Sequence, residues 1–99
     1  MALLLSNYIY RNMIRIIDQF LQELKINGTA EKTIADYGKF LKNINRRKSL
    51  ENWDKTDVHR YIMEKHNECS IGTVEICKVR IKQFFTWAGK SEIVSHLNT

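Results

Sequence analysis

A row of basic side chains is the feature of this sequence best suited to chemistry with an anion. Lys32, Lys39, Lys42 and Arg46 follow one another at intervals of seven, three and four residues. On a helix, at about 100° per residue, all four fall within roughly 80° of one another. Cations on one helix face can neutralise phosphates, and such binding weakens steeply with salt. The alternative is a solvated helix face that binds nothing.

Four further side chains are candidates for the same chemistry. Lys78 and Lys82 lie one helical turn apart and could reach phosphates or base edges from a helix in the major groove. Lys78 could instead pair with Glu75, three residues earlier. Thr33 and Thr73 could donate hydroxyl hydrogen bonds to phosphates, or they could bond locally in the first turn of a helix.

A metal site is not expected. His66 and Cys69 are one turn apart, and Cys77 follows eight residues later. A zinc site needs four ligands at suitable spacing, and nothing places His59 or His96 to complete one. The sequence therefore predicts no metal and no cofactor.

Aromatic side chains do not predict catalysis. Of the four tyrosines, Tyr8, Tyr10, Tyr37 and Tyr61, the last two belong to the apolar packing stripes of the predicted helices. We therefore expect no catalytic residue in this chain. Phe84, Phe85 and Trp87 could stack on bases, but helical spacing favours a place in the core. Trp87 stays open because it lies off the main stripe.

The composition of the chain limits which classes of protein it can belong to. The chain has 99 residues and a net charge of +5, which favours an anionic partner, although a basic soluble domain without one is the plainer alternative. Two cysteines are too few for a disulfide framework, which favours a cytoplasmic, intracellular protein. No stretch approaches the roughly 20 apolar residues of a membrane span, so no membrane association is expected.

Hydrophobic periodicity predicts four helices in a single domain, over residues 7–26, 30–46, 57–68 and 71–88. Hydroxyl side chains are placed to cap the last three, at Thr29, Thr56 and Ser70. Gly28 and Gly89 suit helix ends. Residues 1–6 are expected to be disordered or to extend the first helix, and residues 91–97 to form a last turn. The predicted core is Ile17, Phe20, Leu24, Ile34, Tyr37, Leu41, Trp53, Val58, Ile62, Val74, Ile81, Phe84, Phe85 and Ala88, with Leu50 tucked beside it.

Several motifs recur in one order along these helices. They are Phe20-Leu21-x-x-Leu24 before Gly28, Thr33-x-x-x-Tyr37-x-x-x-Leu41, Val58-x-x-Tyr61-Ile62, Ser70-x-x-Thr73-Val74, and Phe84-Phe85-x-Trp87-Ala88. Over roughly residues 16–97 the chain thereby resembles the N-terminal core-binding domain of tyrosine recombinases and phage-type integrases. The resemblance implies an all-α, SAM-like fold, a compact bundle of four or five helices.

The resemblance also implies a function. In that family this domain is one jaw of a clamp around double-stranded DNA, and a C-terminal catalytic domain is the other. Residues 90–99 then look like the start of a linker to that domain. The resemblance also implies other recombinase protomers on the DNA as partners, and an origin in a phage or mobile element. The expected DNA-binding residues are Lys32, Thr33, Lys39, Lys42, Arg46, Thr73, Lys78 and Lys82. Gly72 and Glu75 depart from the basic or neutral residues common in the family's fourth helix.

A protein-interaction or oligomerisation module without direct DNA binding is the alternative. The apolar start of the chain, with three consecutive leucines at Leu3, Leu4 and Leu5, could dock a partner or a second protomer.

Overall fold

The chain is all-α. A computed structural model describes the backbone of residues 2–98 and the side chains of residues 12–98. This part holds four α-helices, α1 (Ala2–Ile26), α2 (Glu31–Arg47), α3 (Lys55–Glu68) and α4 (Ile71–Trp87), and two 3₁₀ turns, η1 (Leu50–Asn52) and η2 (Ser91–Ile93). The predicted all-α class, the four helices and the last turn are confirmed. No helix within residues 2–98 combines the length and apolarity needed to cross a membrane.

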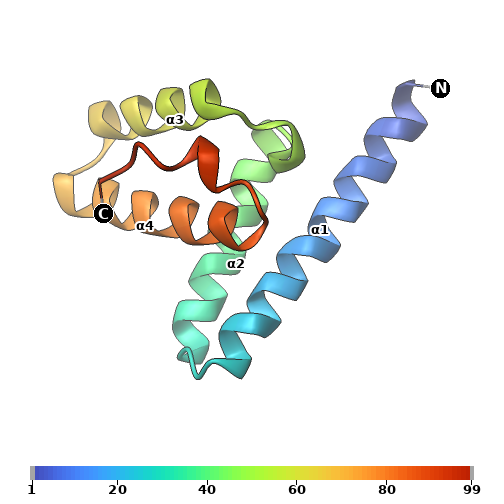
Figure 1. Cartoon of the computed structure of the whole chain (residues 1–99), viewed down its shortest axis with the longest axis horizontal. Coiled ribbons are helices and arrows are strands. Elements are labelled where there is room, and N and C mark those ends of the chain that lie inside the picture. Colours follow the sequence, from blue (N-terminus) through green and yellow to red (C-terminus); the bar gives the residue numbers. More distant parts are fainter. Residues whose placement is uncertain (1, 99) are drawn as a thin grey trace. The chain divides into compact units, whose positions relative to one another are not determined.

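The contacts divide the chain into two units, each built on a pair of helices (Figure 1). Unit 1, Met1–Asn52, contains α1, α2 and η1, and unit 2, Trp53–Thr99, contains α3, α4 and η2. The single domain predicted over the whole chain remains a prediction.

In unit 1 a glycine turn folds α2 back along α1. Gly28 has a φ of +85°, and its N–H donates to Lys25 O at 3.0 Å. The next N–H, of Thr29, donates to Leu24 O at 2.9 Å, which completes a Schellman motif. The type of its side chain had predicted Thr29 as the N-cap of α2, but Thr29 belongs to this motif at the end of α1. Ala30 holds that position without a side-chain bond.

The two helices of unit 1 pack closely at Gly38. A Cβ atom placed on Gly38 would lie 3.1 Å from Leu21 Cδ1. At the adjacent positions, the rings of Phe20 and Tyr37 are tilted with centroids 5.8 Å apart. The buried apolar side chains of the unit are Met13, Ile17, Phe20, Tyr37, Leu41, Ile44 and Leu50, whereas Leu24 and Ile34, predicted as core, are only half-buried.

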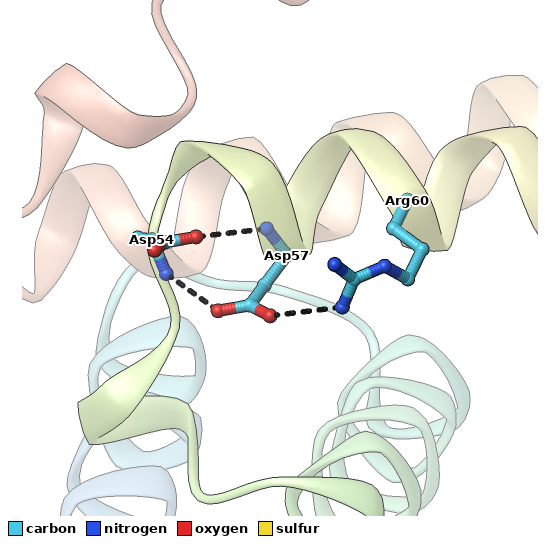
Figure 2. Close-up of polar contacts among 3 residues, drawn as sticks. All are labelled: Asp54, Asp57 and Arg60. Atoms are coloured by element: carbon cyan, nitrogen blue, oxygen red, sulfur yellow. Dashed lines mark hydrogen bonds and ion pairs between the residues drawn. The ribbon is translucent and has the colours of Figure 1, made fainter.

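In unit 2 a reciprocal pair of aspartates starts α3. The N–H of Asp57 donates to Asp54 Oδ1 at 2.9 Å, and the N–H of Asp54 donates to Asp57 Oδ2 at 3.0 Å (Figure 2). This capping box satisfies two N–H groups that the helix itself leaves unpaired. The predicted cap, Thr56, is wrong because the helix begins at Lys55, one residue before it.

The ends of α4 follow the sequence more closely. Ser70 is the N-cap, as predicted, and its Oγ accepts from the N–H of Thr73 at 3.3 Å. Gly89, with a φ of +83°, ends the helix, and Lys90 N–H donates to Phe85 O at 2.8 Å. Ala88 is exposed at the C-cap, so its assignment to the core is wrong: the helix ends before it can turn inward.

The core of unit 2 contains an aromatic group. The Trp53 ring lies 5.8 Å from Tyr61 and 6.1 Å from Phe85, centroid to centroid. Other buried apolar side chains are Val58, Ile62, Val74, Cys77, Ile81, Phe84, Ile93, Val94 and Leu97. The predicted burial of Trp53 and of the α3 stripe is confirmed, as is that of the α4 stripe apart from Ala88.

Replacement of the actual cap should cost stability where replacement of the predicted cap should not. We expect Asp54→Ala to lower the free energy of unfolding by about 1 kcal/mol, within a range of about 0.5–2 kcal/mol, because Asp57 N–H loses its acceptor. The matched control Thr56→Ala, an exposed position, should stay within about 0.5 kcal/mol of the parent. Urea denaturation followed by circular dichroism measures both. Equal costs for the two variants would contradict the capping box.

Candidate nucleic-acid interface

The outward side of α2 carries three of the predicted cations. Tyr37, Leu41 and Ile44 are buried on one side of the helix, and Lys32, Lys39 and Arg46 are exposed on the other. These cations follow at i, i+7 and i+14, which corresponds to steps of about 10.5 Å along the axis. They form no ion pair with any side chain among residues 12–98. We call Lys32, Lys39 and Arg46 the α2 basic row.

Two residues beside the α2 basic row, Thr33 and Asp36, change what it can bind. Thr33 is exposed in the first turn of α2, beside Lys32, so its hydroxyl is accessible to a ligand. Asp36, half-buried, is an acid on the same side of the helix, within about 60° of Lys32 and Lys39 at 100° per residue. It lowers the local positive potential without forming an ion pair among the described residues.

The fourth cation of the predicted stripe is engaged in unit 1. Lys42 Nζ lies 3.4 Å from Asp18 Oδ1, and their side chains are 43% and 52% exposed. Lys42 stands at the edge of the stripe nearest α1, where Asp18 reaches it. A pair this exposed stabilises the fold by little, so a phosphate can compete for the ammonium.

Positive charge is concentrated in unit 1. Met1–Asn52 has nine lysines and arginines against five acids, whereas Trp53–Thr99 has seven against six. Of the overall charge of +5, therefore, +4 belongs to unit 1. Part of it is the run Arg46-Arg47-Lys48 at the end of α2, where the helix dipole also favours cations.

The predicted residues of α4 make local contacts instead. Lys78 Nζ lies 3.1 Å from Glu75 Oε1, with only 17% of the lysine side chain exposed. Lys82 Nζ donates to the backbone oxygen of Leu97 at 3.0 Å. The hydroxyls of Thr73 and Ser70 are 3.2 Å apart. The local alternatives raised by the sequence therefore hold for Lys78 and Thr73, and the contact of Lys82 was not anticipated.

The outward side of α4 carries three exposed apolar side chains beside the exposed carboxylate of Glu75. Ile76, Val79 and Trp87 are 51%, 40% and 39% exposed. With Gly72 and Gln83 they follow steps of four, three, four and four residues, which place them on one face. The apolar residues beyond the main stripe were the sequence signal for this face. We call Ile76, Val79 and Trp87 the α4 apolar row.

The residues considered for a metal do not assemble into a site. Within the described residues no three or more histidine, cysteine or acidic side chains are grouped to hold a metal ion. Both cysteines are free thiols, Cys77 buried and Cys69 half-buried at the end of α3. Burial raises the pKa of the Cys77 thiol, and the hydrogen bond with Tyr61 and the charge of Lys65 oppose that shift.

No family model, curated protein or solved structure matches this chain. The likeness to the recombinase core-binding domain therefore rests on the sequence motifs alone.

The two thiols should differ in reactivity. At pH 8 we expect a disulfide reagent such as DTNB to modify Cys69 quickly and Cys77 only after unfolding, because the thiolate reacts and burial disfavours it at Cys77. Absorbance of the released thiolate, with intact mass, gives the two rates. Cys69→Ser should remove the fast phase and Cys77→Ser should leave it. A fast phase in Cys69→Ser would contradict the burial of Cys77.

Proposed function

We propose that this chain is the DNA-binding arm domain of a site-specific tyrosine recombinase, and that the α2 basic row contacts the phosphate backbone of duplex DNA. The single observation that carries the proposal is the row itself. Three cations line one side of a helix, exposed and without acid partners among residues 12–98, in the unit that holds most of the net charge.

The geometry of the row suits phosphates. Steps of about 10.5 Å carry the charges about 21 Å along the helix, far enough to meet several phosphates on a duplex. Arg46 offers a forked donor that binds phosphate in two places, and Thr33 adds a hydroxyl at the other end. Lys42 joins the row when a phosphate replaces Asp18.

The role of the chain in recombination would be to hold DNA. By its resemblance to the recombinase domain it would be one jaw of a clamp, with strand cleavage and joining supplied by a catalytic domain of the same protein and by other protomers. Our proposal gives this chain no nucleophile, metal or cofactor. The sequence-based expectation named residues of both α2 and α4, and the proposal keeps those of α2 and leaves out those of α4.

A second candidate function, protein interaction, is favoured by the α4 apolar row. Exposed Ile76, Val79 and Trp87 on one helix face suit contact with a protein better than contact with a polyanion. The two functions are separable, because one row lies in each unit.

A charge-removal series tests the proposed function. We expect Lys32→Gln, Lys39→Gln and Arg46→Gln together to weaken duplex binding strongly at low salt. The slope of log affinity against log salt should become shallower by about 2.7, since each phosphate contact contributes about 0.9. Fluorescence anisotropy with a labelled duplex of about 20 base pairs, from 25 to 200 mM salt, measures both quantities.

The matched control removes the same charge from unit 2, at Lys55, Lys65 and Lys78. It should keep the parent salt slope to within about one phosphate contact. Equal slopes for both triple variants would show that binding follows net charge and not the row. A parent protein that binds no duplex at 25 mM salt yet self-associates in analytical ultracentrifugation would favour the interaction module.

A further inference from the structure

The segment that follows α4 is held against both helices of unit 2. After Gly89 the chain turns back, and η2 contacts α3 and α4 (Figure 1). Ile93, Val94 and Leu97 are buried. One polar contact is added, from Lys82 Nζ on α4 to Leu97 O at 3.0 Å. Residues 91–98, which we call the C-terminal segment, are therefore held by three apolar side chains and one charged donor.

The C-terminal segment contains a histidine, His96, whose ring has no hydrogen-bond partner. Both ring nitrogens of His96 are buried and form no hydrogen bond. The ring lies 6.2 Å from that of His59 on α3, centroid to centroid. A neutral imidazole leaves one N–H unpaired here, and an imidazolium would leave two, together with a desolvated charge. The site therefore favours neutral His96.

The charged groups around His96 also favour its neutral form. Lys55 and His59 of α3 disfavour a charged His96. The ammonium of Lys82 on α4 is instead bound to the backbone oxygen of the next residue, Leu97. The acid within the segment, Glu92, is exposed. Burial, then Lys55, then His59 lower the pKa of His96 from the ordinary value of 6.5.

The sign of the pH dependence follows. Above about pH 6.5 His96 is neutral whether the segment is docked or released, so docking is at full strength. Below that pH the released form takes up a proton more readily than the docked form. The docked state is then lost progressively as the pH falls from 6.5 to the lowered pKa of His96. The equilibrium constant for docking changes by at most tenfold for each pH unit in that interval.

We propose that the C-terminal segment is a proton-sensitive latch on unit 2, opened when His96 takes up a proton. Opening exposes Ile93, Val94 and Leu97 and frees the Lys82 ammonium. An anion-binding cation that the docked segment occupies thus becomes available on α4. The latch does not depend on the proposed DNA-binding function, since every group in it belongs to unit 2.

Nuclear magnetic resonance of the whole chain tests the latch directly. Between pH 7.5 and 5.0 we expect the amides of Val94 and Leu97, whose N–H groups donate to Ser91 O and Val94 O, to lose protection from exchange. The loss, corrected for intrinsic exchange, should reach about tenfold per pH unit between 6.5 and the pKa of His96. Amides in the middle of α3 and α4 should keep theirs, and the imidazole carbon shifts of His96 should titrate below 6.5.

Three variants separate the latch from general acid lability. His96→Phe should abolish the pH dependence, and His59→Gln should reduce it by removing a neighbouring charge. Lys82→Gln should lower protection of the segment at every pH without moving the midpoint. Unchanged protection of the wild-type segment at pH 5.0, loss of α3 and α4 protection together with it, or retained pH dependence in His96→Phe would each overturn the proposal. The wild-type titration decides the first two even where a variant does not fold.

Discussion

The close approach of α1 and α2 at Gly38 is the constraint on which the proposed interface depends. Glycine within a helix costs about 1 kcal/mol relative to alanine, so its presence needs a packing reason. Here a Cβ atom would meet Leu21 at 3.1 Å. With Gly38, Tyr37 and Leu41 turned toward α1, the rotation of α2 is fixed. The opposite side, with Lys32, Lys39 and Arg46, must then face outward.

Cations have a different use in unit 2. Lys78 pairs with Glu75, Lys65 with Glu68 and the Tyr61 ring, and Lys82 with a backbone oxygen. These contacts lie within α4, within α3, or between α4 and the C-terminal segment, so the cations hold the unit together. In unit 1 the comparable contact is that of Lys42 with Asp18. Neighbouring acids and carbonyls thus decide which of the cations on α2 and α4 remain available to a ligand.

Features that depend on the helical period of the sequence were predicted correctly. Features that depend on contacts between elements were missed. Three-and-four spacing placed α2 and α4 to within one residue at each end, and the helical wheel placed Lys32, Lys39 and Arg46 on the exposed side. Caps were less predictable, because Asp54, Thr56 and Asp57 are all good capping types and only backbone geometry chooses among them. The bond of Lys82 to Leu97 spans fifteen residues and has no local signal.

The proposed interface also limits what this chain can contribute to site choice. Phosphate contacts fix the register of a protein on DNA but carry no sequence information. Direct readout needs side chains that reach base edges in the major groove. Lys78 and Lys82, the candidates for that task, are bound to Glu75 and to Leu97, and the outward side of α4 carries exposed apolar side chains. In the proposed role the chain supplies salt-sensitive affinity through α2. Discrimination between DNA sites must then come from DNA shape, from a further domain, or from Lys82 once the C-terminal segment is released.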